Sequence, residues 1–476
     1  MTDPLDLDAT AQAELVRDGQ ISPLELVDGA IGRIEALNPE LNAVIWPLFD
    51  QARADAGRAL PEGPFSGVPM LLKDFAAELE GTPFSEGSDL AGAYTSPFSQ
   101  ELTRRFQRAG FVICGKTNTP EFAILPTTEP RRFGPSRNPW DPGRTTGGSS
   151  GGSSAAVASG MVAVAHANDG GGSIRIPASC CGLFGLKPTR ARVSQAPRYG
   201  DVMGGLVSEH VVTRSVRDSA AVLDMIAGPV PGDPYRAPPP ERAFRDEVGT
   251  EPGRLRIALS TSAPSGAKVD PACSAAARAA AELCVELGHD VVEAAPRIDG
   301  DAFTEHFVVM WAAGNAWVML DWEERLGRSA EEHEVEPLTW ALVSMGRATT
   351  ADRYLKAVQE LQKVSRGIAA FFEDHDVLLT PTLASPPPPL GTFDSPPDNP
   401  LDGLLTAGAF IPFTPLFNVT GQPAASVPLH WTSDGLPIGV QIATRFGDEA
   451  TLLRLAGQLE AARPWAHRRP PLWAGS

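Results

Sequence analysis

Two serines of the chain stand in glycine-rich turns that suit them for chemistry at a carbonyl group. Ser149 lies inside the run GGSSGG at 147–152, and Ser173 directly follows the three glycines at 170–172. Such glycines let backbone N–H groups crowd against a ligand atom, because no Cβ stands in the way. A serine hydroxyl reacts as a nucleophile only beside a base and an oxyanion hole. The two turns therefore predict an active site whose base comes from elsewhere in the chain.

Serine and glycine runs are also typical of flexible linkers. Here the residues between the turns, 153–165, are mostly Ala, Val, Ser and Met, and the apolar run IRIP follows at 174–177. A linker has no use for such apolar residues. We predict that 153–165 form a close-packed, buried helix that holds the two turns at a fixed separation.

Lys73 is the candidate base. It follows the apolar residues 68–72 and would end a buried strand, where loss of hydration disfavours the ammonium ion and lowers its pKa. Position alone nevertheless favours an exposed lysine whose charged end reaches solvent. The residue type fits the chemistry, but the sequence pattern leaves its burial open.

Two other motifs point to different chemistry. Residues 110–117, GFVICGKT, match the phosphate-binding loop, but FVIC has the apolar, β-favouring character of a strand instead of a loop. Residues 147–151 match G-x-S-x-G, the nucleophile elbow, which needs a strand directly before the serine. Residues 134–146 contain three prolines and are typical of a loop, so we favour neither motif. His210 is the histidine nearest to the turns, and no histidine has metal-ligand spacing.

The composition excludes several classes of partner. The formal net charge is -18, whereas nucleic acids and anionic membranes select basic surfaces. The five cysteines show no CxxC spacing, so we expect core thiols and neither disulfides nor a zinc site. No apolar run has the length of a membrane span, and the acidic start of the chain is unlike a signal peptide. We expect a cytoplasmic protein without a nucleic-acid or membrane partner.

Periodicity predicts alternating helices and strands. A capping box with proline at the first helical position starts a helix at Ser22. Strand, helix and strand at 255–260, 271–287 and 291–292 form a βαβ unit, and residues 228–253 connect it to the preceding part. Further helices are expected at 99–108, 301–372 and 448–462, and further strands at 111–114, 376–380, 425–429 and 436–442, the last two joined as a hairpin across Asp434-Gly435.

Six segments of the chain occur together in one known family. They are SPLELVDGAIGRIEALNPELNAV (22–44), GVPMLLKD (67–74), GKTNTPEF (115–122), GGSSGGSSAAVASG (147–160), NDGGGSIRIPASCCGLFGLKPT (168–189) and NVTGQPAASVPL (418–429). The sequence thereby resembles the amidase signature family over most of its length. The resemblance implies an α/β fold in which one large twisted mixed β-sheet is sandwiched between helical layers. It also implies a single amidase domain, 1–476, with a signature core at about 63–215 and a variable, substrate-side helical region at about 300–372.

The resemblance assigns roles by position. Ser173 corresponds to the family's nucleophile, Ser149 to its bridging serine after a cis peptide bond, and Lys73 to its base. The oxyanion hole falls on the backbone N–H groups of Gly170, Gly171, Gly172 and Ser173, and Ser150 and Arg175 fall on supporting polar positions. Glycine at 170 departs from the larger residue usual there in the family. The implied Ser-Ser-Lys chemistry, with an acyl-enzyme, uses no cofactor and no metal.

A narrower resemblance leads to the group that contains the hydrolase of the 6-aminohexanoate cyclic dimer. It is carried by DATAQAELVRDGQIS (8–22), NAVIWPLFDQARADA (42–56) and RNPWDPGRTTGGSSGG (137–152). The resemblance implies hydrolysis of small or oligomeric non-peptide amides, among them cyclic amides, anilides and carbamates or urethanes. The expected partner is a small amide or carbamate substrate, and the expected state is a monomer or a homodimer.

Two rival functions stay open. One is the glutamine-hydrolysing A subunit of a tRNA-dependent amidotransferase, and the other is a catalytically inactive binding protein on an amidase scaffold. The substrate pocket is also open, because Phe303, Phe307 and Trp311 form one helical stripe. Core packing is the more frequent reason for such a stripe. If Phe307 and Trp311 instead wall the pocket, the site favours bulky apolar amides.

Overall fold

The computed structural model describes residues 3–475. The α-helices of this range are α1 (Ala9–Arg17), α2 (Pro23–Leu41), α3 (Phe49–Ala56), α4 (Glu101–Arg108), α5 (Gly151–Ala158), α6 (Arg175–Cys181), α7 (Val216–Ile226), α8 (Pro271–Glu286), α9 (Gly300–Leu326), α10 (Pro337–Arg347), α11 (Ala351–Asp374), α12 (Asp402–Phe410), α13 (Pro415–Thr420) and α14 (Glu449–Ala462). Short 3-10 helices lie at η1 (Pro4–Asp6), η2 (Asp89–Ala91), η3 (Glu121–Ala123), η4 (Phe244–Glu247) and η5 (Glu332–Glu334).

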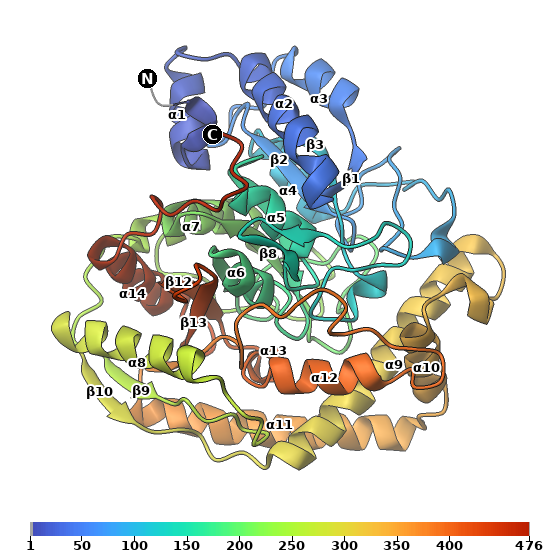
Figure 1. The fold of residues 1–476 in the computed structure, drawn as a ribbon, viewed down its shortest axis with the longest axis vertical. Coiled ribbons are helices and arrows are strands. Elements are labelled where there is room, and N and C mark those ends of the chain that lie inside the picture. Colours follow the sequence, from blue (N-terminus) through green and yellow to red (C-terminus); the bar gives the residue numbers. More distant parts are fainter. Residues whose placement is uncertain (1–2, 476) are drawn as a thin grey trace.

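The strands fall into one large and one small sheet. They are β1 (Val44–Pro47), β2 (Pro69–Lys73), β3 (Val112–Thr117), β4 (Arg137–Asn138), β5 (Asp141–Thr145), β6 (Val164–Asp169), β7 (Phe184–Lys187), β8 (Ser208–Thr213), β9 (Arg256–Leu259), β10 (Asp290–Glu293), β11 (Val377–Pro381), β12 (Ala424–Trp431) and β13 (Pro437–Ala443). The 11-stranded sheet has the order β1-β3-β2-β6-β8-β7-β12-β13-β11-β9-β10, and β4 pairs with β5 apart from it. Its edges, at β1 and β10, lie at opposite ends of the molecule (Figure 1).

The large sheet is mixed and is covered by helices on both faces. Strand β2 runs parallel to β3 and β6, whereas β8 and β12 pair antiparallel with their neighbours. Side chains alternate between the faces. Met70 and Leu72 pack in a core with α1, α4, α7, α8 and α14, whereas Leu71 packs in a second core with α2, α3, α5, α6 and α12. The predicted fold, a mixed sheet between helical layers, is confirmed.

The helices α9, α10 and α11 form a third cluster beside the sheet. Trp311, Met319 and Trp322 of α9 pack there with residues of α10 and α11 and with the segment that contains Phe84. Figure 1 shows α12 beside α9 and α10, although α12 lies well after these helices in the sequence. Within residues 3–475 no helix is both long enough and apolar enough to cross a membrane.

Several local predictions are confirmed. The βαβ unit is present as β9, α8 and β10, and the hairpin across Asp434-Gly435 joins β12 to β13. The last three residues of the FVIC segment begin β3, which continues through Gly115, Lys116 and Thr117, so these residues form no phosphate-binding loop. The five cysteines are free and buried.

Two local predictions are wrong. The helix expected over 153–165 is limited to α5, which ends before Gly160, and residues from Val164 onward belong to β6. Gly160 has a φ of 78° and a Cβ on it would lie 2.9 Å from the ring of Trp473, so the chain turns there. The segment 134–146 is not simply a loop, because β4 and β5 pair within it. That small pair lies outside the large sheet, and its last residue, Thr145, precedes the turn that carries Ser149.

Candidate active site

Lys73 is the last residue of β2, and its side chain is fully buried. The exposed lysine that position alone favoured is therefore wrong. Its Nζ is 2.6 Å from the Oγ of Ser149 and 2.6 Å from the Oδ1 of Asn168. A neutral amine in this position donates an N–H to the Oδ1 of Asn168, an oxygen that can only accept, and turns its lone pair toward the Ser149 hydroxyl. This arrangement lets Lys73 take a proton from Ser149.

The protonation state of Lys73 follows from its surroundings. Burial lowers the pKa of Lys73 to about 7, because an ammonium ion loses its hydration there. The negative charges of Glu209, Asp169 and Glu86 oppose this effect and keep the pKa from falling further. A pKa near neutrality gives a substantial fraction of free amine at physiological pH, as a general base requires.

Ser149 stands in a turn that is packed too tightly for larger residues. The peptide bond between Gly148 and Ser149 is cis, as the resemblance implied. A Cβ on Gly148 would lie only 2.2 Å from the carbonyl oxygen of Thr127, so glycine alone fits. The neighbouring hydroxyl of Ser150 donates to the carbonyl oxygen of Asn168 over 3.3 Å. Ser150 thus ties the turn to the end of β6, next to Lys73.

Ser173 lies in the loop that joins β6 to α6. It is 7% exposed and lines a large cavity together with Gly171. In the described part of the chain, the backbone N–H groups of Gly171, Gly172 and Ser173 donate to no protein acceptor. Gly172 has a φ of 135°, which only glycine adopts readily, and a Cβ there would collide with Thr414 and Ile176. These free N–H groups could hold an oxyanion beside the Ser173 hydroxyl.

A buried ion pair anchors the loop from below. The Nε and Nη2 of Arg175 each donate to a carboxylate oxygen of Asp169 over 2.9 Å. Arg175 also donates to the carbonyl oxygen of Thr414 and to the side chains of Gln441 and Asn418. Burial alone would raise the pKa of Asp169, but the charge and hydrogen bonds of Arg175 lower it to about 2. Asp169 and Arg175 stand on either side of the glycine turn, so the ion pair between them holds the N–H groups of the turn in place.

The cavity in front of Ser173 has a volume of about 570 Å³ and mostly apolar walls. Phe303, Phe307 and Trp311 of α9 form one wall, with successive ring centroids 6.1 and 5.7 Å apart in stacked orientation. Residues of α12, among them Leu404 and Leu405, face it from another side. Pockets of this size hold drug-sized molecules. The aromatic stripe on α9 therefore lines the cavity and also belongs to the core, because Trp311 packs in the third cluster as well.

Comparison with known proteins places this geometry in a family. The family model described as Amidase matches residues 25–453. The chain is 43% identical over 478 residues to the 6-aminohexanoate-cyclic-dimer hydrolase of Pseudomonas sp. (strain NK87), covering 98% of this chain and 96% of the relative. The protein belongs to the amidase signature family.

Solved structures agree with this membership. A structure of 6-aminohexanoate cyclic dimer hydrolase superposes with a TM-score of 0.95 at 41% identity and covers 99% of this chain and all of that one. A bacterial aryl acylamidase of the amidase signature family gives a TM-score of 0.87 at 27% identity, covering 97% and 98% of the two chains. Both the family and the narrower resemblance expected from the sequence are confirmed.

The positions expected from the sequence fall into three groups in this amidase. Lys73 contacts both Ser149 and Asn168, Ser150 contacts the backbone of Asn168, and Ser173 opens onto the cavity. Phe307 and Trp311 line that cavity. Arg175 supports the loop from the far side. The catalytic roles of these residues stay predictions.

Other positions were missed by sequence reasoning or have no place in the amidase site. Sequence reasoning missed Asn168 and Asp169. Their position directly before the glycine turn is a local signal that could have identified them. The contribution of α12 to the cavity has no local signal. His210 is not among the residues that line the cavity; burial lowers its pKa to about 3, and its Nε2 is 2.8 Å from the Oγ of Ser219. Among residues 3–475 no three His, Cys, Asp or Glu side chains gather as metal ligands would.

Proposed function

We propose that this amidase hydrolyses the C–N bond of small or oligomeric non-peptide amides through Ser173, Ser149 and Lys73. The observation that carries the proposal is the buried amine of Lys73, 2.6 Å from the hydroxyl oxygen of Ser149. A lysine with this environment is a free base near neutral pH, and a serine beside it can pass a proton from a second serine. The N–H groups of Gly170, Gly171, Gly172 and Ser173 form the proposed oxyanion hole, and those of residues 171–173 donate to no protein acceptor in the described part of the chain.

The reaction follows in balanced steps. The Oγ of Ser173 bonds to the substrate carbonyl carbon while its proton moves to Ser149 and the proton of Ser149 moves to Lys73. The turn N–H groups hold the resulting oxyanion, and each well-placed donor contributes about 3 kcal/mol to the transition state. The protons return along the same path to the leaving nitrogen, and the C–N bond breaks. Water, activated through the same relay, then hydrolyses the ester on Ser173.

The substrate class is supported by the cavity and by the relatives. A volume of about 570 Å³ with apolar and aromatic walls favours bulky neutral groups, because each buried methylene adds about 0.8 kcal/mol of binding. Two of the proteins reported above are named as a hydrolase of a cyclic amide dimer and as an aryl acylamidase. We therefore propose cyclic amides, anilides and carbamates or urethanes as the substrate class.

The nucleophile is tested by covalent labelling. A fluorophosphonate should add to the peptide that contains Ser173, and the Ser173→Ala protein should give no adduct by mass spectrometry. An adduct on Ser149 in the wild-type protein would contradict the assignment.

The substrate class is tested with the purified protein alone. We expect kcat/KM for an anilide, an aryl carbamate or a cyclic amide to exceed that for acetamide and glutamine. A preference for glutamine would instead favour the A subunit of an amidotransferase. Absence of turnover on every compound, in a folded protein, would favour a binding protein.

A further inference from the structure

A chain of buried polar groups runs behind the amine of Lys73. The backbone N–H of Lys73 donates to the Nδ1 of His166 over 3.2 Å, and the Nε2 of His166 is 2.8 Å from the Oε2 of Glu209. Because a backbone N–H can only donate, Nδ1 carries a lone pair and the ring proton sits on Nε2, from which it is donated to Glu209. The contacts therefore fix both the ring and the tautomer of His166.

Glu209 also lies beside the second contact of Lys73. In the antiparallel pair of β6 and β8, Glu209 is the direct partner of Asn168, whose Oδ1 accepts from the Nζ of Lys73. Directly opposed residues of such a pair project on the same face of the sheet. Glu209 is thus linked to Lys73 in two ways. It hydrogen-bonds His166, which contacts the backbone of Lys73, and it lies next to Asn168, which contacts the amine of Lys73.

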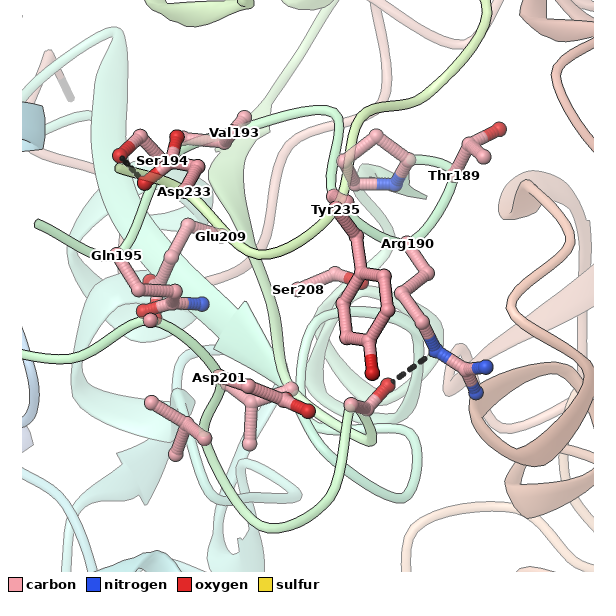
Figure 2. A pocket seen from close by; sticks show the side chains of 16 residues that line it. Thr189, Arg190, Val193, Ser194, Gln195, Asp201, Ser208, Glu209, Asp233 and Tyr235 are labelled. Carbon is pink, nitrogen blue, oxygen red and sulfur yellow. Dashed lines mark hydrogen bonds between the residues drawn. The ribbon is translucent and has the colours of Figure 1, made fainter. Parts of the chain in front are cut away.

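The carboxylate of Glu209 is weakly compensated. Glu209 is 2% exposed, and its Oε1 has no hydrogen-bond partner among the described residues. Figure 2 shows Glu209 with Gln195 in the wall of a second cavity, of about 30 Å³. That volume has room for roughly one water molecule, so the cavity is no second substrate site. A buried charge without a full set of partners acts over a longer range than one in water.

The other charges around Lys73 are more fully paired. Asp169 is held by Arg175, and Glu86 accepts from the indole N–H of Trp322. Burial raises the pKa of Glu86 to about 7, so that its charge is incomplete at neutral pH. Within residues 3–475, no lysine or arginine forms an ion pair with Glu209, whose carboxylate accepts from the ring of His166. His166 itself is neutral in the tautomer above.

We propose that Glu209 is a positioning residue for the amidase reaction, which fixes the backbone of Lys73 through His166 and whose charge sets the pH at which Lys73 becomes a free base. The proposal rests on the role of Lys73 in the proposed function. Glu209 touches neither substrate nor reacting atoms. It acts by holding the base in place and by stabilising its protonated form, so that the amine titrates near neutral pH.

The Glu209→Gln variant separates charge from shape. Glutamine keeps an oxygen that accepts from His166 but removes the negative charge. The ammonium form of Lys73 then loses stabilisation, so the acid limb of kcat/KM should move to lower pH, by about one unit. Glu209→Asp keeps the charge but withdraws it by one methylene, so the acid limb should stay in place while kcat falls.

Glu121→Gln serves as the matched control. Glu121 is a buried glutamate whose pKa burial raises to about 8, it hydrogen-bonds Ser88, and it makes no contact with Lys73 or His166. Its replacement should leave the acid limb unchanged. Circular dichroism and thermal melts check that each variant is folded.

The outcomes are distinct. If Glu209→Gln loses activity equally at every pH, with the acid limb at its wild-type position, the role in setting the pH is wrong. If Lys73→Ala keeps wild-type activity, the proposed function itself fails. If Glu209→Gln does not fold, His166→Gln decides, because it breaks the contact and keeps the charge. A fall in kcat at an unchanged acid limb then supports the positioning role, and an unchanged kcat overturns it.

Discussion

The backbone of Gly170 lies against the ring of Trp311. A Cβ on Gly170 would be 3.5 Å from the Cζ3 of Trp311 and 3.2 Å from a methyl group of Val207. The glycine at 170 therefore lets the turn of Ser173 pack closely against Val207 and Trp311. The next residue repeats the relationship, since a Cβ on Gly171 would lie 3.6 Å from the ring of Phe307.

We predict that Gly170→Ala lowers kcat/KM for an anilide by about threefold to tenfold, because the new methyl group would lie 3.2 Å from Val207 and slightly shift the turn that bears Ser173. A thermal melt should show only a small loss of stability. Adding Val207→Ala, which removes the methyl group that lies too close, should restore part of the activity. Equal losses in the single and double variants would contradict a coupling between residues 170 and 207.

The aromatic wall should control selectivity. In Trp311→Ala we expect kcat/KM for an anilide or aryl carbamate to fall about ten- to a hundredfold more than for acetamide, because loss of apolar contact costs about 1.5–3 kcal/mol only where the substrate is large. Trp317→Ala is the matched control, because Trp317 lies on the same helix but packs against Tyr199. A Trp311→Ala protein that loses stability but keeps wild-type selectivity would show that the aromatic stripe serves core packing and does not select the substrate.

The pH dependence should follow Lys73. Its pKa is lowered by burial to about 7, and the reaction needs the neutral amine, so kcat/KM should fall about tenfold per unit below pH 7 and level off above it. Lys73→Ala should lose most activity at every pH. A stopped assay on an anilide between pH 5 and 9 measures the profile. A folded Lys73→Ala protein with near wild-type rates would require another base.

The ion pair beneath the turn should be important for stability. Arg175→Met leaves the carboxylate of Asp169 buried without its partner, which costs about 3–5 kcal/mol in the free energy of unfolding. Urea denaturation measures this loss. Adding Asp169→Asn removes the stranded charge, so the double variant should be more stable than Arg175→Met. A double variant that is less stable would show that Asp169 contributes mainly through its contacts with Asn418 and the loop.

The wild-type ion pair also predicts an acid sensitivity. The folded state holds the pKa of Asp169 at about 2, below its ordinary value of 3.8. The stabilisation is therefore complete above pH 4 and is lost as the pH falls from 4 toward 2. The difference in stability between the wild type and the Asp169→Asn/Arg175→Met double variant should shrink over the same range. A difference that stays constant with pH would contradict this linkage.

Several features could be predicted from local sequence. The glycines around Ser149 and Ser173 predict tight turns. Only glycine tolerates the close approach of Thr127 at position 148, and only glycine readily adopts the positive φ at position 172. The alternating strands and helices around β9, α8 and β10 follow from periodicity and punctuation by Pro and Gly. The family followed from six short segments, and these segments also carried the fold.

Other features were decided by tertiary structure alone. Position left the burial of Lys73 open, because a lysine after an apolar strand is buried or exposed according to what packs around it. The helix expected over 153–165 failed for a local reason instead, because Gly160, with a φ of 78°, ends α5 and the N–H of Met161 donates back to the carbonyl oxygen of Ala156. The contacts of Glu209 with His166, and the wall that α12 adds to the cavity, join segments far apart in sequence. No local pattern encodes such contacts, since they arise only when the sheet order brings β6 and β8 together and α12 folds over α9.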